Sequence, residues 1–524
     1  MKDIADGAKL SRRWERTELR LYNSMTRKLE LFTPIERGKV GMYVCGITSY
    51  DLSHIGHARA ATSFDILLRY LMYLEYDVKY VRNFTDVDDK IIKRANEIGE
   101  DPVSLSNRYC EEYLSDMDSI QCLRPTVEPR VTKHMEQIIN LISKIIDNGY
   151  AYVVEGDVLF SVEKVPNYGQ LSGQKLENMK AGGRVDVDPR KHHPSDFALW
   201  KSAKAGEPSW ESPWGPGRPG WHIECSAMSQ IYLTHEFDIH GGGLDLIFPH
   251  HENEIAQSYA ACQDSKVNFW MHNGHVRVDN EKMSKSLGNF FTIREITELY
   301  HPLALRYFLI SAHYRSPLNY TIRQLEIASS EVFYIFQSLV DCEATVGRLT
   351  EALDGNEIES SKVSGVAADG RNCIAKLNEE FENKLSDDLD VPQFLNGALK
   401  EAFRFMNNSL MASKKKMQKQ QKMQMVRALS EVSRAASDVL KVLGVVGEES
   451  YVEVVEQLKG KALRRGGITE SDVQRFIEER AVARQNKDFA KSDEIRALLF
   501  SRGIALEDIA NLTIWKPTHL KDNL

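Results

Sequence analysis

Apolar and polar residues alternate along the first hundred positions in a way that predicts a parallel βαβ unit. Residues 40–44 form an apolar run typical of a buried strand, and residues 60–76 repeat apolar positions at helical spacing. Residues 77–84 alternate like a second strand, and residues 90–98 predict another helix. This order predicts a right-handed parallel unit. Residues 21–37 predict a short strand or ribbon that leads into it.

The sheet is predicted to continue after an interruption. Residues 130–148 have the pattern of an amphipathic helix, and residues 150–162 that of a hairpin. Residues 166–220 are rich in Gly, Pro, Lys and Trp, and we interpret them as an insertion between two halves of the sheet domain. The second half is predicted as a helix from Trp221, a strand at 237–240 ending in 241–243, a helix from near Pro249 to Ala261, and a strand at 268–271.

The remainder of the chain is predicted to be mostly helical. A polar loop at 274–289 precedes helices at 293–300 and 302–311, and the helical pattern then runs from 322 to 446. The last part is predicted as a linker at 447–467 and a small domain of two helices and a strand at 471–515. A basic tract at 413–422 is interpreted as a solvated helix face or inter-helix loop rather than an RNA-facing patch.

Composition narrows the class of protein. The 524 residues suffice for several domains, and 42% hydrophobic and 27% charged residues are typical of a soluble globular protein. A net charge of −8 excludes a generally basic nucleic-acid coat, though not a local basic patch. No apolar run is long enough to span a bilayer, so we expect no membrane partner. Residues 1–20 are charged and include acids, which disfavours a signal or transit peptide, while a removed presequence stays open. Seven scattered cysteines indicate a reducing compartment.

A cysteine and two histidines surround the junction between the first strand and its helix. Cys45 follows the apolar run, and His54 and His57 flank Gly56 just before the helix. Open parallel sheets bind ligands at the carboxyl ends of their strands, and the N–H groups at a helix start attract phosphate. Gly56 leaves room for a flat base or a phosphate near the backbone. For an isolated pair of histidines, the structural alternative is two satisfied surface side chains.

A second set of residues has the chemistry of a metal site. Cys45, Cys225, His250 and Glu254 could meet at the carboxyl edge of the sheet, since His250 and Glu254 are four apart on one predicted helix. Two thiolates, an imidazole and a carboxylate suit tetrahedral zinc. Spacing alone leaves other members open, and two buried structural cysteines are the alternative. The residues that could substitute are His235, His240, His251 and Glu252.

Several segments together resemble the cysteinyl-tRNA synthetases, a family of class I aminoacyl-tRNA synthetases. The His-Ile-Gly-His quartet at 54–57 and the Lys-Met-Ser-Lys-Ser stretch at 282–286 match the two nucleotide motifs of class I enzymes. The likeness covers residues 21–515. Further matching stretches are 41–48, 80–86, 220–226, 237–243 and 248–254.

The resemblance implies one Zn²⁺ per chain, held by Cys45, Cys225, His250 and Glu254. The family uses this zinc to bind the sulfur of the substrate cysteine, which a serine hydroxyl replaces poorly. Trp221 and His240 would line the amino-acid pocket. For those two, the alternatives are core packing and a structural hydrogen bond.

The resemblance also implies the reaction: ATP-dependent ligation of L-cysteine to tRNA(Cys) through a cysteinyl-adenylate. His54, Gly56 and His57 would bind ATP, with Mg²⁺ on its phosphates, and both histidines would act in catalysis. Lys282 and Lys285, on a mobile loop, would grip the phosphates and are the other catalytic candidates. The implied fold is α/β, with a Rossmann-like parallel sheet domain that carries an insertion, then an α-helical bundle and a small C-terminal α+β domain.

The implied organisation assigns tRNA binding to the C-terminal half. We expect a cytoplasmic monomer. The expected divisions are an N-terminal extension (1–20), the catalytic domain (21–130 and 220–273) with a connective insertion (131–219), a nucleotide-loop and stem-contact region (274–321), a helical bundle (322–446), a linker (447–470) and an anticodon-binding domain (471–524).

The C-terminal residues and the nucleotide motifs bear on two competing functions, a cysteine ligase that acts on an amino sugar and a non-catalytic tRNA-binding paralogue. Residues 483–496 and 503–508 resemble the family's anticodon-binding domain, although residues 511–515 lack the glycine that the family usually has there. Arg484, Lys487 and Trp515 are candidates for RNA contacts, with a charged helix face and a packing Trp as the alternative. Cysteine ligases that act on an amino sugar would not need this tail. A non-catalytic tRNA-binding paralogue would not need intact nucleotide motifs.

Overall fold

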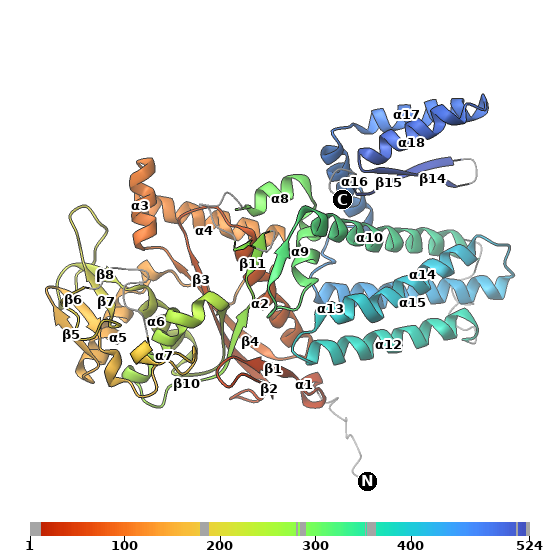
Figure 1. The fold of residues 1–524 in the computed structure, drawn as a ribbon. Helices are drawn as coiled ribbons and strands as arrows, with labels where there is room; N and C mark the ends of the chain where they lie inside the picture. The colour runs from red at the N-terminus through yellow and green to blue at the C-terminus, as the bar shows by residue number, and fades with distance from the viewer. Residues whose placement is uncertain are drawn as a thin grey trace, which may run out of the picture. The chain divides into compact units, whose positions relative to one another are not determined.

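Four parallel strands form the main sheet, in the order β10-β9-β3-β4 (Figure 1). The strands are β3 (Lys39–Thr48), β4 (Asp77–Thr85), β9 (Glu236–Gly243) and β10 (Lys266–Asn273). In β3, Val40, Met42 and Val44 are buried, as the apolar run predicts. The parallel βαβ unit and the later return of the chain to the same sheet are confirmed.

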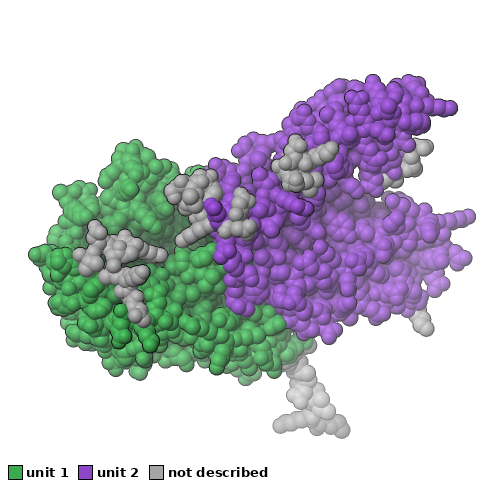
Figure 2. All heavy atoms as spheres, in the orientation of Figure 1, with its two compact units in different colours: residues 1–118, 123–275, 386–388 green, residues 119–122, 276–385, 389–524 purple. Residues whose placement is uncertain are grey.

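This architecture comes from a computed structural model. It describes residues 12–178, 188–278, 281–282, 290–351, 353, 363–509 and 512–519. The chain divides into two compact units (Figure 2). The first comprises residues 1–118, 123–275 and 386–388, and the second comprises residues 119–122, 276–385 and 389–524.

Helices cover the sheet and begin at its carboxyl edge. Helix α2 (Ile55–Tyr73) contacts β4, β9 and β10, and α6 (Trp221–Leu233) contacts β3, β4 and β9. Helix α2 starts five residues earlier than predicted. His54 explains the difference, because its imidazole caps the helix and satisfies N–H groups of the first turn. The predicted helix over 90–98 is α3 (Asp89–Ile98), and α4 (Pro102–Ser119) follows it.

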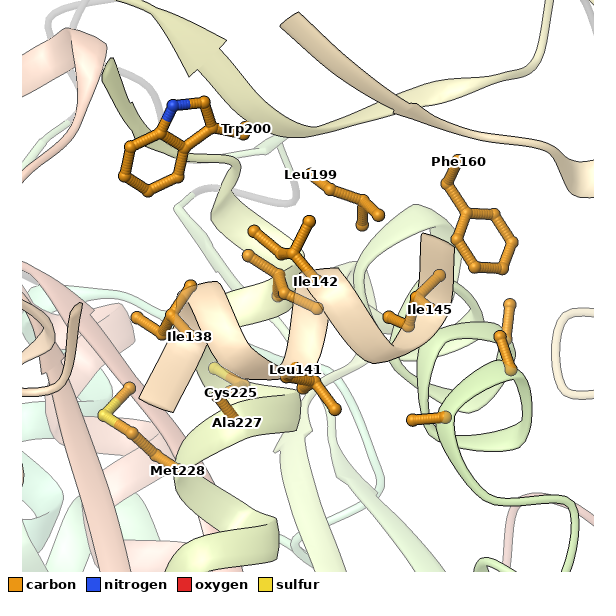
Figure 3. Packing of buried hydrophobic residues seen from close by; sticks show 14 of the residues in the cluster. Ile138, Leu141, Ile142, Ile145, Phe160, Leu199, Trp200, Cys225, Ala227 and Met228 are labelled. Carbon is orange, nitrogen blue, oxygen red and sulfur yellow. The ribbon is translucent and has the colours of Figure 1, made fainter. Parts of the chain in front are cut away.

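The predicted insertion contributes to the core of the first unit. Helix α5 (Met135–Asp147) packs against α6, and the two share a buried apolar cluster with the antiparallel sheet β5-β6-β7-β8 (Figure 3). The predicted hairpin is β5 (Ala151–Val154) and β6 (Asp157–Phe160). Strands β7 (Phe197–Ser202) and β8 (Gly217–Pro219) were not predicted. Labelled members of the cluster are Ile138, Leu141, Ile142, Ile145, Phe160, Leu199, Trp200, Cys225, Ala227 and Met228.

The ribbon at the start of the chain is confirmed as β1 (Arg20–Asn23) paired antiparallel with β2 (Lys28–Leu31). A short helix, α1 (Arg13–Arg16), precedes it.

The predicted polar loop over 274–289 is partly wrong, since β11 (Val276–Val278) and β12 (Glu281–Lys282) lie in it. Strand β11 pairs in parallel with β13 (Leu318–Tyr320). Such a partner, some forty residues away, leaves no periodic pattern in the sequence.

The second unit is dominated by helices, as predicted. Turns join α14 to α15 at residues 414–418, so the basic tract at 413–422 spans helix ends and an inter-helix loop, as interpreted. No helix among the described residues is long and apolar enough to cross a membrane. The helices are α8 (Ile293–Leu299), α9 (Pro302–Ile310), α10 (Ile322–Thr350), α12 (Val366–Ser386), α13 (Val391–Phe394), α14 (Lys400–Ser413) and α15 (Lys419–Val442).

The interval predicted as a linker, 447–467, is instead mostly helix α16 (Tyr451–Gly466). Ser450 and Glu453 form a capping box at its start, and its apolar face is buried. The terminal part contains α17 (Glu470–Gln485) and α18 (Phe489–Ser501), as predicted. It has two strands rather than one, because β14 (Ile504–Ile509) and β15 (Leu512–Pro517) form a hairpin.

Candidate metal and nucleotide site

A bulge places Cys45 at the carboxyl edge of the sheet. The register between β3 and β4 shifts between Val44 and Ile47. Gly46 lies in this shift, and its N–H donates to Oδ1 of Asn83 over 2.9 Å. A bulge redirects the side chains next to it, and bulges are frequent beside functional sites.

Four side chains predicted from the sequence meet at this edge; we call Cys45, Cys225, His250 and Glu254 the donor cluster. The Cys45 Sγ lies 3.6 Å from the Cys225 Sγ and 3.4 Å from the His250 Nε2. Glu254 Oε1 lies 3.3 Å from the Cys45 Sγ and 3.1 Å from the His250 Nε2. All four donor atoms lie within 4.8 Å of one another. The structure thus brings the predicted set together, while its role as a ligand set stays a prediction.

The spacing fits a tetrahedral divalent ion. With zinc bond lengths of about 2.0–2.3 Å, tetrahedral donors of these types stand roughly 3.3–3.8 Å apart. The observed separations fall a few tenths of an ångström short of that range, or within it. Glu254 Oε2 is buried and makes no hydrogen bond in the described part of the chain. Buried polar atoms without partners are costly, and a bound cation would satisfy this one.

The electrostatics of the donor cluster favour a positive charge at its centre. Burial lowers the pKa of His250, but the charges of Glu254 and Cys225 outweigh it and raise that pKa to about 10. Burial raises the pKa of Cys225, but the hydrogen bond with Cys45 and the charge of His250 bring it down to about 6. Burial and the neighbouring Cys225 hold the pKa of Cys45 well above its usual value. The proton on Nε2 of His250, which faces Cys45 and Glu254, therefore occupies the place that a divalent ion would take.

His250 reaches the donor cluster from the first turn of a helix that follows a kink. The helical turn over Ile247–His251 is broken at Phe248, whose backbone is extended, and the helical segment after this kink continues directly into α7 (Glu252–Ala261). The expectation of a helix from near Pro249 to Ala261 is confirmed, and His250 and Glu254 meet as predicted. The Nδ1 of His250 lies 2.9 Å from the Nδ1 of His222, which holds the ring in place.

The two histidines of the nucleotide motif form a capping box at the start of α2. Nδ1 of His54 accepts hydrogen bonds from the N–H groups of Gly56 and His57, at 3.0 and 3.4 Å. Nδ1 of His57 accepts in turn from the N–H of His54 over 3.4 Å. A neutral imidazole that accepts at Nδ1 keeps its proton on Nε2. Both rings, stacked with centroids 3.7 Å apart, therefore present an Nε2–H donor beside the helix N-terminus.

The two predicted pocket residues border the donor cluster. The ring of Trp221 lies 4.3 Å from that of His250, measured between centroids. His240 stacks on Trp270 at 4.4 Å, and its Nε2 lies 3.5 Å from the Cys45 Sγ. Both rings lie beside the donor cluster, and their role in substrate binding stays a prediction.

Sequence reasoning missed several neighbours of the donor cluster. Asn83, His222 and His272 contact its members or their supports. Asn83 and His222 lie in the matching stretches 80–86 and 220–226, but no spacing in the sequence pointed to them as neighbours of the cluster. Among the open alternatives, His240 and His251 do lie beside the cluster. Glu252 does not belong to it, since its carboxylate accepts from the N–H of Ser172 over 2.8 Å.

The remaining predicted residues stand as follows. The backbone of Lys282 is in β12, whereas the Lys282 side chain and Lys285 lie outside the described residues. Arg484 pairs with Asp508 over 2.9 Å, and Lys459 lies over the ring of Trp515 at 5.5 Å. Both contacts are compatible with a charged helix face and a packing Trp as well as with RNA binding, so the RNA contacts stay a prediction.

Comparisons with known proteins agree on one family. The family model described as "tRNA synthetases class I (C) catalytic domain" matches residues 31–330. A cytoplasmic cysteine–tRNA ligase of Arabidopsis thaliana is 59% identical over 96% of this chain and 98% of its own length. A chloroplastic/mitochondrial one from the same plant is 56% identical over 95% and 86%. A cysteine–tRNA ligase of Trichlorobacter lovleyi is 47% identical over 95% and 99%.

Solved structures agree on the fold. A methionyl-tRNA synthetase of Mycobacterium tuberculosis in complex with methionyl-adenylate aligns with a TM-score of 0.59 at 14% identity, over 83% of this chain and 94% of that one. The expected class I α/β fold is therefore confirmed. Full-length identity of this kind leaves one assignment: the chain belongs to the cysteinyl-tRNA synthetase family of class I aminoacyl-tRNA synthetases.

Proposed function

We propose that the protein ligates L-cysteine to tRNA(Cys) in two steps. ATP and cysteine first form cysteinyl-adenylate and pyrophosphate, and the cysteinyl group then passes to the terminal ribose of the tRNA with release of AMP. The observation that supports this most is the buried donor cluster beside the histidine-capped start of α2. Membership of the family supplies the substrates.

The donor cluster would hold one Zn²⁺ per chain through Cys45, Cys225, His250 and Glu254. When bound, zinc supplies a soft Lewis acid that prefers a thiol to a hydroxyl. The chain itself positions the ligands: His222 orients the ring of His250 over 2.9 Å. Trp221 and His240 would enclose the amino acid.

The start of α2 would bind the phosphates of ATP. Both histidines lie at a helix N-terminus, where an Nε2–H donor suits negative charge that builds on the reacting phosphate. Gly56 allows close approach of the nucleotide. We assign the grip on the outer phosphates, which Mg²⁺ would share, to Lys282 and Lys285.

For the tRNA, we propose binding by the helices of residues 322–446 and by the terminal domain of residues 471–524. We propose that activation of cysteine takes place in the catalytic domain (21–130 and 220–273), which carries the connective insertion (131–219). A monomer in the cytoplasm is the form proposed. A reducing compartment suits the structure because Cys45 and Cys225 must remain thiols to bind a metal. The organellar relatives make chloroplast or mitochondrion the other outcome of a fractionation experiment.

The first test is cysteine-dependent ATP–pyrophosphate exchange, with serine as the control substrate and metal content measured alongside. We expect exchange with cysteine only, and its loss with the metal in Cys225→Ser. His54→Asn separates capping from catalysis, because asparagine also caps helices but lacks the Nε2–H. We expect it to fold normally and to lose exchange about 10²-fold or more.

The second test supplies the acceptor. Incorporation of labelled cysteine into tRNA(Cys), and none into an amino sugar, would separate the proposal from the amino-sugar ligases. Absence of exchange in folded, zinc-loaded protein would instead favour the non-catalytic tRNA-binding paralogue.

A further inference from the structure

One face of α16 carries long polar side chains at helical spacing. Counted from Gln457, the other members Lys461, Arg464 and Arg465 follow after four, seven and eight residues, so all four lie on one side of the helix. We call them the α16 stripe. Within the second unit, α16 contacts α8, and the stripe also reaches His301 at the start of α9.

Two members of the α16 stripe cap the C-terminal end of α8. The last carbonyls of a helix have no partner within that helix and need donors from elsewhere. Nζ of Lys461 donates to the carbonyl of Thr297 over 2.6 Å and to that of Glu298 over 3.2 Å. Arg465 donates to the carbonyl of Leu299 over 2.9 Å. Positive groups at this end also complement the helix dipole, so α16 supplies the cap that α8 lacks by itself.

The other two members of the stripe fix the junction between α8 and α9. Arg464 forms an ion pair with the carboxylate of Glu298. Nδ1 of His301 accepts from the N–H of Leu303 over 3.1 Å, so its proton is on Nε2, which donates to Oε1 of Gln457 over 2.7 Å. The four side chains together determine where α8 ends and in which direction the chain continues.

The remaining faces of α16 are anchored in the second unit. Arg502 donates to the carbonyl of Gly466 over 3.0 Å, and a Cβ at Gly466 would lie 2.2 Å from the backbone oxygen of Arg502. The two segments thus approach as closely as a glycine allows. The helix also packs against α10 through an apolar face. Its buried apolar residues are Val454, Val455, Leu458 and Ala462. Helix α16 is therefore a fixed support for α8.

Helix α8 is the first helix after the second nucleotide motif, residues 282–286. Lys282 ends β12, and Thr292 caps α8 further along the chain. Thr292 and Glu295 exchange hydrogen bonds of 2.8 and 3.2 Å in a capping box, which fixes the point where the chain enters α8. On the other side of the motif, β12 pairs with β11, and β11 pairs with β13. The motif therefore lies in the chain between an anchored strand and an anchored helix.

We propose that Lys461, Arg464 and Arg465 are positioning residues for the reaction with ATP, because they hold α8, the helix that follows the second nucleotide motif. None of them is assigned a contact with substrate. The inference rests on the proposed function, in which Lys282 and Lys285 grip the outer phosphates. Such a grip depends on position, since a misplacement of about 1 Å can cost about 10²-fold in rate. Loss of the cap on α8 should therefore impair the use of ATP and spare the binding of cysteine, which the donor cluster governs.

The first test is ATP–pyrophosphate exchange by full-length variants, with ATP and cysteine varied separately. Lys461→Met keeps an unbranched side chain and removes the donors. We expect its kcat/KM for ATP to fall about tenfold or more, with an unchanged KM for cysteine. Lys461→Arg can donate to the same carbonyls and should restore most of the loss. Lys459→Met is the matched control on the same helix, because Lys459 contacts Glu456 and the ring of Trp515 instead of α8, and it should behave as wild type.

The second test is amide hydrogen exchange, which needs neither activity nor a folded variant. Coupling is reciprocal, so saturating ATP should slow exchange in α8 and in residues 461–466 of the wild type. In Lys461→Met, α8 should exchange about fivefold faster, while the unfolding midpoint of the whole protein stays near that of wild type.

The outcomes separate this inference from the proposed function. A folded Lys461→Met with wild-type kcat/KM for ATP, an equal loss for ATP and cysteine, or no response of α16 to ATP would overturn the inference and leave the proposed function standing. If Lys461→Met does not fold, the wild-type hydrogen exchange decides. A wild type without cysteine-dependent exchange of pyrophosphate would overturn the proposed function, and the response of α8 and α16 to ATP would then decide the inference by itself.

Discussion

Gly46 offers a sharp test of how the sheet supports the donor cluster. A Cβ added at Gly46 would lie 1.6 Å from the backbone oxygen of Asn83 and 2.7 Å from its carbonyl carbon. Contacts of a real Cβ under 3.0 Å essentially never occur, so β3 and β4 would have to separate locally by roughly 1.4 Å in Gly46→Ala. Backbone in the middle of a paired sheet cannot yield as a side chain does.

The cost can be worked from two effects. Overpacking of this kind costs about 1–3 kcal/mol. Separation would also break the hydrogen bond from the Gly46 N–H to Oδ1 of Asn83, which is buried and worth about 1–3 kcal/mol when a partner is left unsatisfied. We therefore expect Gly46→Ala to destabilise the protein by about 2–6 kcal/mol and to displace Cys45, with loss of bound metal.

Gly41→Ala is the matched control, because Gly41 lies on the same strand. A Cβ there would meet Leu233 and Phe237 at 3.5 Å, which is ordinary van der Waals contact. We expect this variant to keep its metal and to change stability by less than about 1 kcal/mol. Thermal and urea unfolding, with metal content by elemental analysis, measure both variants. A Gly46→Ala protein with normal metal and a wild-type midpoint would refute the argument from the bulge.

Three further predictions concern stability and metal binding. The hydrogen bonds from Arg480 hold the pKa of Asp508 well below its usual value, so this pair stabilises the fold above about pH 4 and loses its effect as the pH falls further. Asp508→Asn should cost about 1 kcal/mol at pH 7, and the difference from wild type should shrink steadily as the pH falls below about 4 and vanish only below the lowered pKa of Asp508, as hydrogen exchange of α17 can show. Arg306 is fully buried and donates to the carbonyls of Leu443, Ile120 and Gln121. In urea unfolding, Arg306→Leu should therefore lower the free energy of unfolding by about 3 kcal/mol or more, because it leaves these carbonyls without a donor. Arg306→Lys should lower it by less. Removal of metal with a strong chelator should lower the free energy of unfolding of wild type by about 4 kcal/mol if free metal stood about 1,000-fold above its Kd. The unfolding midpoint should fall with it, and that of Cys225→Ser should not change.

Local patterns predicted most of the sheet domain. The run at 77–84 predicted β4 to within one residue, whereas the run at 40–44 predicted only part of β3, which extends to Thr48. Helix α16 was missed although Ser450 and Glu453 have the spacing of a capping box, because residues 447–467 were interpreted as a linker. Strands β11 and β13 pair across some forty residues, and pairing at that distance depends on the tertiary fold rather than on local sequence.

The site shows the same division between local and long-range information. His250 and Glu254 were predictable as a pair because they are four residues apart. His240 and His251 were two of several alternatives, and only the order of strands, with β9 beside β3, brings His240 next to Cys45. The bulge at Gly46 depends on contacts between distant segments, and so do the hydrogen bonds that link His251 through His272 to Ser24. Neither has a sequence pattern of its own.

The spacing of the donor cluster along the chain has a consequence for biosynthesis. Cys45 and Glu254 are 209 residues apart, and Cys225 lies 180 residues after Cys45. During translation, Cys45 leaves the ribosome long before any partner exists, so its thiol must stay reduced while the intervening insertion is made. Uptake of the proposed metal would therefore be a late event, since it cannot precede the synthesis of α7. A cell short of zinc would be expected to accumulate full-length chains in which no metal holds the four ligands together.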